Sequence, residues 1–137
     1  MPWHWQPITL GICLILLASL ASPAAADGDA SKGATTFSVC KACHRIGPDA
    51  RNTVGPELNG VVGRKAASNP DYSYSSALKA SGITWDEATL TQWLHSPRAL
   101  VQGTKMTFAG LRKDEDIANV IAYLRTFDPQ GNTVAAK

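Results

Sequence analysis

The sequence predicts a single all-α domain of three main short helices joined by long loops. Three segments carry apolar residues at helical spacing, and a stretch rich in Gly, Pro and Asn separates the first from the second. No segment sustains the apolar–polar alternation that strands need. A chain of 137 residues suits one compact domain and is short for two. We therefore expect one core.

The first 26 residues have the pattern of a secretory signal peptide. No charged residue occurs from Ile8 to Ala26, and Ala24 and Ala26 frame an A-x-A cleavage site before Asp27. The alternative is an uncleaved membrane anchor, because these 19 residues just reach the length of a membrane helix. Cleavage would export residues 27–137 to the periplasm as one domain, with 128–137 as a flexible tail.

The first helix is expected near Asp29 to Val39, where Phe37 can face the core and Gly33 lets another helix approach closely. A minor helical turn is expected from Ser75 to Ala80.

The second main helix lies in "TWDEATLTQWLHSP", where Thr84 and Glu87 have capping-box spacing and Pro97 ends the helix. The last helix lies in "DEDIANVIAYLRTFDP". Its acidic start suits the helix dipole, and its apolar residues recur at steps of three and four.

The segment "VCKACHRIG" holds the main candidate ligand residues, because it places Cys40, Cys43 and His44 within five positions. A zinc site would need a second ligand pair, but the mature part offers only the lone His95. A thioredoxin-like redox pair would need a helix after it, whereas Gly47 and Pro48 follow. C-x-x-C-H is the attachment signature of haem c, in which both thiols add to the haem vinyl groups and the histidine faces the iron. We predict one covalently attached haem.

The function depends on the sixth position of the iron, because a strong second ligand leaves electron transfer as the main chemistry. Met106 is the only methionine after Met1, and it lies in "QGTKMTFAG", between two glycines. A methionine is more often core filler than ligand, but its place downstream of a haem motif favours ligation here. His44 and Met106 are thus the candidate iron ligands. An open haem that binds gases or reacts with peroxide remains an alternative.

The long segment from Arg45 to Tyr74 would be unusual in an ordinary domain without secondary structure. Around a haem it is reasonable, because the cofactor supplies an apolar body that Leu58, Val61 and Val62 can cover.

From Gly28 to Phe127 the chain resembles class I cytochrome c, of the small bacterial kind related to the mitochondrial protein. The segments that carry the resemblance are "GDASKG" with Phe37, "CKACH", "VGPELNGVVGRKA", "YSYSSALKASGITW", "TLTQWLHSPRALVQGTKMTFAG" and "IANVIAYLRTF". The resemblance implies a cytochrome c fold and His44/Met106 ligation. It also implies that Thr104 places the ligand loop.

By the same resemblance, Arg64, Tyr74 and Trp85 donate hydrogen bonds around the haem propionates, which need donors when buried. Three residues depart from the family pattern, and they bear on the tuning of the haem site. Trp93 stands where mitochondrial members carry a tyrosine, Leu78 where asparagine is frequent, and Gln102 where a proline is common.

The implied function is one-electron transfer in the periplasm without conversion of a substrate, so the protein is not expected to be an enzyme. Donors would be a quinol-oxidising complex or a dehydrogenase, and a terminal acceptor would receive the electrons. A second possibility is that the protein is the dedicated redox partner of one periplasmic dehydrogenase. The partners are redox proteins that dock at the haem edge of a monomer. Nucleic acid is not expected to bind.

Overall fold

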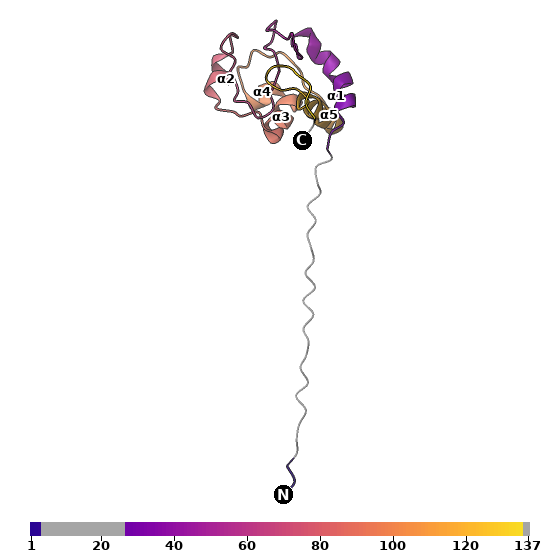
Figure 1. Ribbon diagram of the computed structural model, residues 1–137. Helices are drawn as coiled ribbons and strands as arrows, with labels where there is room; N and C mark the ends of the chain where they lie inside the picture. The colour runs from indigo at the N-terminus through magenta and orange to yellow at the C-terminus, as the bar shows by residue number, and fades with distance from the viewer. Residues whose placement is uncertain (4–26, 136–137) are drawn as a thin grey trace.

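The computed structural model describes residues 1–3 and 27–135, and the predicted signal peptide therefore lies outside the described residues. The described part is helical: it has six short helical elements and no named strand, only isolated bridges between Lys65 and Thr84 and between Phe127 and Thr133. Within it, no helix has the length and apolar character needed to cross a bilayer. Figure 1 shows these helices gathered into one body with long connecting loops.

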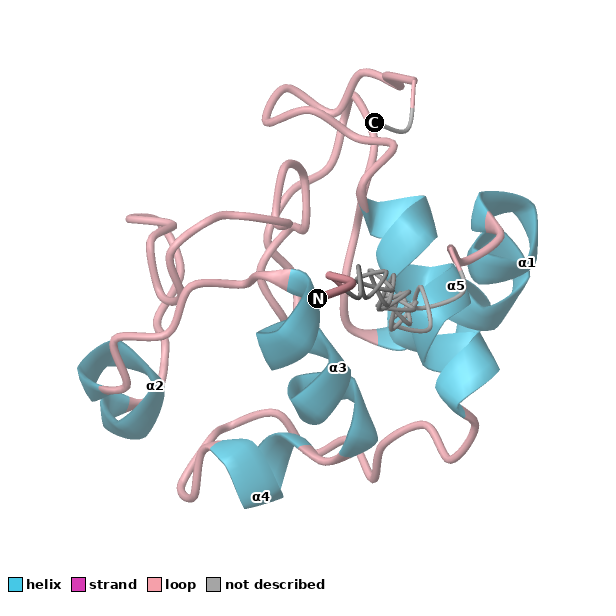
Figure 2. Ribbon diagram, turned by 90° about the horizontal axis from the view of Figure 1, so that it is seen from below, coloured by secondary structure: helices cyan, strands magenta, loops and turns pink. Residues whose placement is uncertain are grey.

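The elements are α1 (Ala30–Thr36), the 3-10 helix η1 (Phe37–Ala42), α2 (Ser76–Ala80), α3 (Glu87–His95), α4 (Pro97–Leu100) and α5 (Asp114–Leu124). Helix α5 packs against α1 and α3, and α3 packs against α4. In Figure 2, α2 lies at the opposite end of the body from α1.

The contact between α1 and α5 depends on small residues. A Cβ added to Gly33 would lie 1.9 Å from the carbonyl oxygen of Asn119, and one added to Gly28 would lie 2.0 Å from that of Ala118. The buried Asn119 side chain also accepts a hydrogen bond of 2.7 Å from the Asp29 amide. The predicted close approach at Gly33 is therefore confirmed, and Phe37 lies in the core as expected.

The helix ends refine the sequence prediction. The first helix changes to 3-10 geometry at Phe37, so Cys40 lies in a tighter turn than a continuous helix would give. Helix α3 is capped by Asp86, whose Oδ1 accepts from the Thr89 amide at 2.8 Å. The predicted capping box at Thr84 is wrong, because Thr84 bridges to Lys65 instead. Ser96 both ends α3 and caps α4, where Pro97 is the first residue.

The C-terminal segment folds back over the loop that follows the cysteine pair. Asp128 accepts hydrogen bonds from the amides of Gln130 and Asn132, and Gly131 is buried. A Cβ at Gly131 would lie 2.1 Å from the carbonyl oxygen of Gly47. We expected a flexible tail from residue 128, but the residues described up to 135 begin with this packed turn.

Candidate functional site

An apolar cavity of about 260 Å³ lies in the middle of the body, between α3, α5, η1 and the long loops. All eight residues predicted for the haem site line it: Cys40, Cys43, His44, Arg64, Tyr74, Trp85, Thr104 and Met106. Core residues complete the wall, among them Phe37, Leu58, Val61, Leu78, Leu90, Trp93, Leu94, Val120 and Leu124. The fold therefore gathers residues from almost the whole length of the described domain around one apolar space.

Two other residues that were singled out from the sequence do not line the cavity. Val62 packs against the core without lining the cavity, and Gln102 is exposed. Trp93 and Leu78 are buried in the wall, and the Trp93 ring lies 5.0 Å from that of Trp85.

The two cysteines lie on one tight turn. The amides of Cys43 and His44 both donate to the Cys40 carbonyl, at 3.1 and 2.9 Å. Both thiols are free and half-buried. Burial, and to a smaller degree Cys43, raises the pKa of the Cys40 thiol to about 11. Cys40 is thus a neutral thiol at pH 7 in this fold.

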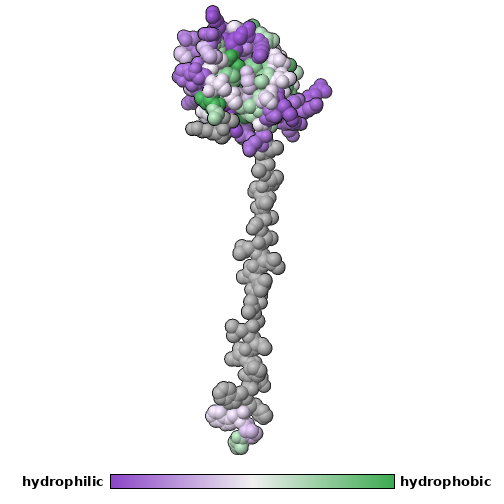
Figure 3. All heavy atoms as spheres, turned by 45° about the vertical axis from the view of Figure 1, so that its right-hand side comes forward, coloured by the Kyte–Doolittle hydropathy of each residue, from purple (hydrophilic) through white to green (hydrophobic). Residues whose placement is uncertain are grey.

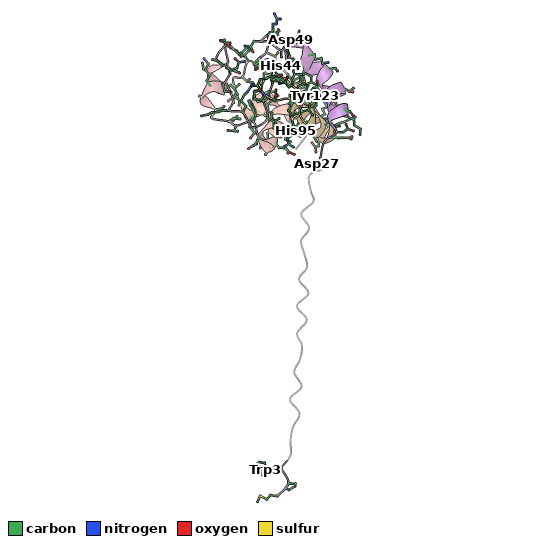
Figure 4. All side chains as sticks on the ribbon, viewed as in Figure 1. Trp3, Asp27, His44, Asp49, His95 and Tyr123 are labelled. Atoms are coloured by element: carbon green, nitrogen blue, oxygen red, sulfur yellow. The ribbon has the colours of Figure 1, made fainter. Side chains whose placement is uncertain are left out.

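The structure offers no second pair of ligands for a zinc ion among the described residues. Within residues 1–3 and 27–135, no three His, Cys, Asp or Glu side chains come together in a group that could hold a metal ion. His95 pairs with Asp114 at 2.9 Å, at the junction of α3 and α5, and it does not line the cavity. Figure 4 labels both His44 and His95 in the folded body.

The hydrogen bonding of His44 leaves one ring nitrogen, Nε2, available to bind a metal. Its Nδ1 lies 2.7 Å from the Pro56 carbonyl, which can only accept, so Nδ1 carries the proton of the neutral ring. Burial lowers the pKa of His44, although the Pro56 bond acts in the opposite direction. The neutral imidazole then keeps a lone pair on Nε2, which is the form that binds a metal.

The loop after His44 is fastened to the cysteine turn. The Cys43 carbonyl accepts from the Gly55 amide at 2.8 Å and from the Thr53 hydroxyl at 2.6 Å. These bonds bring Pro56 to the imidazole and lay Gly55 against it. Sequence reasoning did not find Gly55, and the neighbouring "GP" dipeptide, a turn signal, was the only local indication.

Met106 lies half-buried in the loop between α4 and α5. Its amide donates to Thr104 Oγ1 at 3.2 Å, and the Thr104 amide donates to the Val101 carbonyl at 3.1 Å. At the far end of the loop, the Leu111 amide donates to the Leu94 carbonyl at 2.8 Å. Thr104 thus makes two hydrogen bonds within the loop that carries Met106 to the cavity wall.

The polar side chains of the wall are held by the long loop between η1 and α2. Arg64 donates to the Asn59 carbonyl at 2.9 Å and to the Glu57 carbonyl at 3.3 Å. Tyr74 accepts from the Asn69 amide at 3.3 Å, and burial raises the pKa of its phenol. Sequence reasoning missed Glu57, Asn59 and Asn69, because they contribute backbone groups to these bonds, and the sequence does not show which backbone groups of a loop come together.

This donor set fits a covalently bound haem: two free thiols on one turn, a neutral imidazole, a thioether, and an apolar cavity with an arginine and a tyrosine in its wall. The cytochrome c family model matches residues 30–128. The chain belongs to the cytochrome c family. Its haem is therefore haem c, attached through Cys40 and Cys43.

Curated relatives agree with this membership. The cytochrome c2 of Rhodomicrobium vannielii is 51% identical over 117 residues, which are 85% of this chain and 90% of the relative. The cytochrome c-550 of Bradyrhizobium diazoefficiens is 52% identical over 102 residues, which cover 74% of this chain and 75% of the relative. This cytochrome is accordingly an electron-transfer protein.

Solved structures confirm the fold. Cytochrome cH from Methylobacterium extorquens superposes with a TM-score of 0.69 at 49% identity, covering 72% of this chain and 99% of that one. Cytochrome c2 from Rhodospirillum centenum gives a TM-score of 0.71 at 36% identity, with coverage of 74% and 100%. The all-α cytochrome c fold predicted from the sequence is thus correct.

Proposed function

We propose that this cytochrome carries single electrons on a haem c whose axial ligands are His44 and Met106. The observation that carries the proposal is that both side chains line the same apolar cavity, although 62 positions separate them (106 − 44). His44 presents a free Nε2, and Met106 supplies the only thioether of residues 27–137. With both ligands in place, the iron has no open position for substrate chemistry.

When bound, the haem supplies an iron that alternates between the ferrous and ferric states. The chain holds this centre in a fixed, mainly apolar environment, so that little rearranges when the charge changes. His/Met ligation favours the reduced state compared with two histidines. Arg64, Tyr74 and Trp85 lie in the wall, where their polar groups would face the propionates, and Thr104 supports the ligand loop.

Electrons would enter and leave where the cavity reaches the surface. Val39 and Val54 belong to its wall and are 56% and 72% exposed. In Figure 3, weakly polar and hydrophobic side chains occupy much of the middle of the visible face, and strongly hydrophilic side chains lie mainly around its margin. We infer that redox partners dock at this opening on a monomer. The proposed route is from a quinol-oxidising complex or a dehydrogenase to a terminal acceptor, in the periplasm after removal of residues 1–26.

The test is a visible spectrum of the protein matured in a host that attaches haem. The reduced protein should show the sharp bands of haem c, and the oxidised protein the weak red band of a sulfur–iron bond. Met106→Ala should remove the red band and admit cyanide rapidly, and Met106→His should fold with a markedly lower reduction potential. Arg112→Ala, at an exposed position of the same loop that does not line the cavity, is the control and should resemble the wild type. Equal rates of cyanide binding in wild type and Met106→Ala would overturn His/Met ligation.

A further inference from the structure

Arg64 stands between two different environments. Its side chain belongs to the wall of the haem cavity and also to the wall of a polar groove that is lined by residues of the long loop and by Pro129 and Gln130. Glu57 lines this groove and does not line the haem cavity. The Arg64 and Glu57 side chains are 25% and 19% exposed, so they meet largely away from water.

Glu57 is held firmly in this position. Its Oε2 accepts from the Asn59 backbone amide at 2.7 Å, and its Oε1 lies 3.5 Å from both Arg64 Nη1 and the side-chain Nδ2 of Asn69. Its own backbone amide donates to Asn52 Oδ1 at 2.9 Å. The carboxylate is therefore a fixed negative charge directly behind the arginine of the cavity wall.

Two physical effects of this charge act in the same direction. The ferric haem carries one more positive charge than the ferrous haem, so a nearby carboxylate stabilises the ferric state, and it does so more strongly where water is excluded. A carboxylate paired with Arg64 also offsets the positive charge that the arginine presents to the cavity, and it draws the guanidinium toward the groove. Both effects lower the reduction potential.

We propose that Glu57 is a positioning residue that lowers the reduction potential of the haem by competing with the haem propionates for Arg64. This inference rests on the proposed function, in which the haem binds in this cavity. It assigns a role to a residue that has no contact with the cavity itself.

The experiment compares midpoint potentials, measured by optical redox titration of the matured proteins. Glu57→Gln removes the charge but keeps an oxygen that can accept from the Asn59 amide, and its potential should shift upward. Asp71→Asn is the matched control, because Asp71 lines the same groove but is exposed, and no ion pair joins it to Arg64. Its shift should be clearly smaller.

Glu57→Asp keeps the negative charge but shortens the side chain, so it separates the effect of the charge from that of the side-chain shape. If the charge matters, the potential of Glu57→Asp stays nearer to the wild type than that of Glu57→Gln. If Glu57 only fills space and orders the loop, the isosteric glutamine stays nearer. Glu57→Gln should also shift the potential less in an Arg64→Gln background than in the wild type, because part of its effect acts through the arginine.

An unchanged or lower potential in Glu57→Gln, or a shift equal to that of Asp71→Asn, overturns the proposal. So does a glutamine variant that lies nearer to the wild type than the aspartate variant. Failure of the proposed function would look different: the wild type itself would lack the haem c bands or the sulfur–iron band before any potential is compared.

Discussion

Gly55 lies directly against the imidazole of His44. A Cβ added to Gly55 would lie 2.5 Å from Cε1 and 2.8 Å from Nδ1 of the ring. Such distances are far below van der Waals contact, so no side chain fits at residue 55 while the imidazole stays in place. Gly55 thus leaves the space that the imidazole of the proposed iron ligand occupies, and the Pro56 carbonyl orients the ring through Nδ1.

Gly55→Ala should therefore disturb the His44 side of the haem. The added methyl group must move the imidazole or the loop, and overpacking of this kind costs about 1–3 kcal/mol of unfolding free energy. We expect a lower midpoint in chemical denaturation and an altered ligand-field spectrum. Arg51→Ala, at an exposed position of the same loop that does not line the cavity, is the control. Wild-type stability and spectra in Gly55→Ala would show that the loop yields freely.

A chain without haem should be largely unfolded. Many of the core residues line the cavity, including Val61, Tyr74, Leu78, Trp85, Trp93 and Leu94. Without the cofactor these side chains lose their central packing partner, and the helices are too short to be stable alone. Cys40→Ser combined with Cys43→Ser, purified free of haem, should lose most of its far-UV circular dichroism. Near-native helix content in this variant would contradict the prediction.

The C-terminal turn should stabilise the domain through Gly131. Gly131 (φ +82°) and Gly63 (φ +86°) share a left-handed backbone, but an added Cβ meets the Gly47 backbone only at Gly131. Gly63→Ala should cost about 1–2 kcal/mol, the usual price of that conformation. Gly131→Ala should cost clearly more, as measured by denaturant titration. Equal losses in the two variants would mean that the turn detaches easily.

Association with an acidic redox partner should depend on salt. Lys41, Lys105, Arg98, Arg112 and Lys113 are all exposed, and Lys105 lies in the cavity wall, where its ammonium group donates to the Ser73 carbonyl at 3.0 Å. Charges on a docking surface act over a Debye length of about 10 Å at 0.1 M salt. We expect the bimolecular electron-transfer rate to fall as salt rises.

Lys105→Glu should slow this reaction at low salt more than Lys79→Glu does, since Lys79 is exposed on α2 and does not line the cavity. Stopped-flow kinetics at several salt concentrations can compare them. A rate that does not change with salt, or equal rates for the two variants, would point to an apolar contact at Val39 and Val54 instead.

The sequence was sufficient for the features that depend on local patterns. Cys40, Cys43 and His44 are adjacent in the chain, and α5 follows from the periodicity of its apolar residues. Met106 was found because no other methionine follows Met1. The capping box failed because Asp86, which the sequence prediction overlooked, caps α3, while Thr84 lies before the helix in a bridge to Lys65.

The remaining features arise from contacts between distant segments. Neither the contact of Gly55 with the imidazole nor the pairing of Glu57 with Arg64 has a spacing rule in the sequence. The C-terminal turn packs on Gly47, far along the chain, and its Gly, Pro and Asn composition is equally typical of a free tail. Such contacts exist only once the fold has brought the backbone segments together.

The Met106 loop is attached mainly at its two ends, near Val101 and at Leu111. From Lys105 to Gly110, the described structure contains one amide hydrogen bond, that of Met106 to Thr104. This segment can therefore open as a small unit while α1 and α5 stay packed, because its opening breaks few bonds. Amide hydrogens of α5 should exchange with solvent only when the whole domain unfolds, and those of the loop much sooner, at a rate that the proposed sulfur–iron bond would limit.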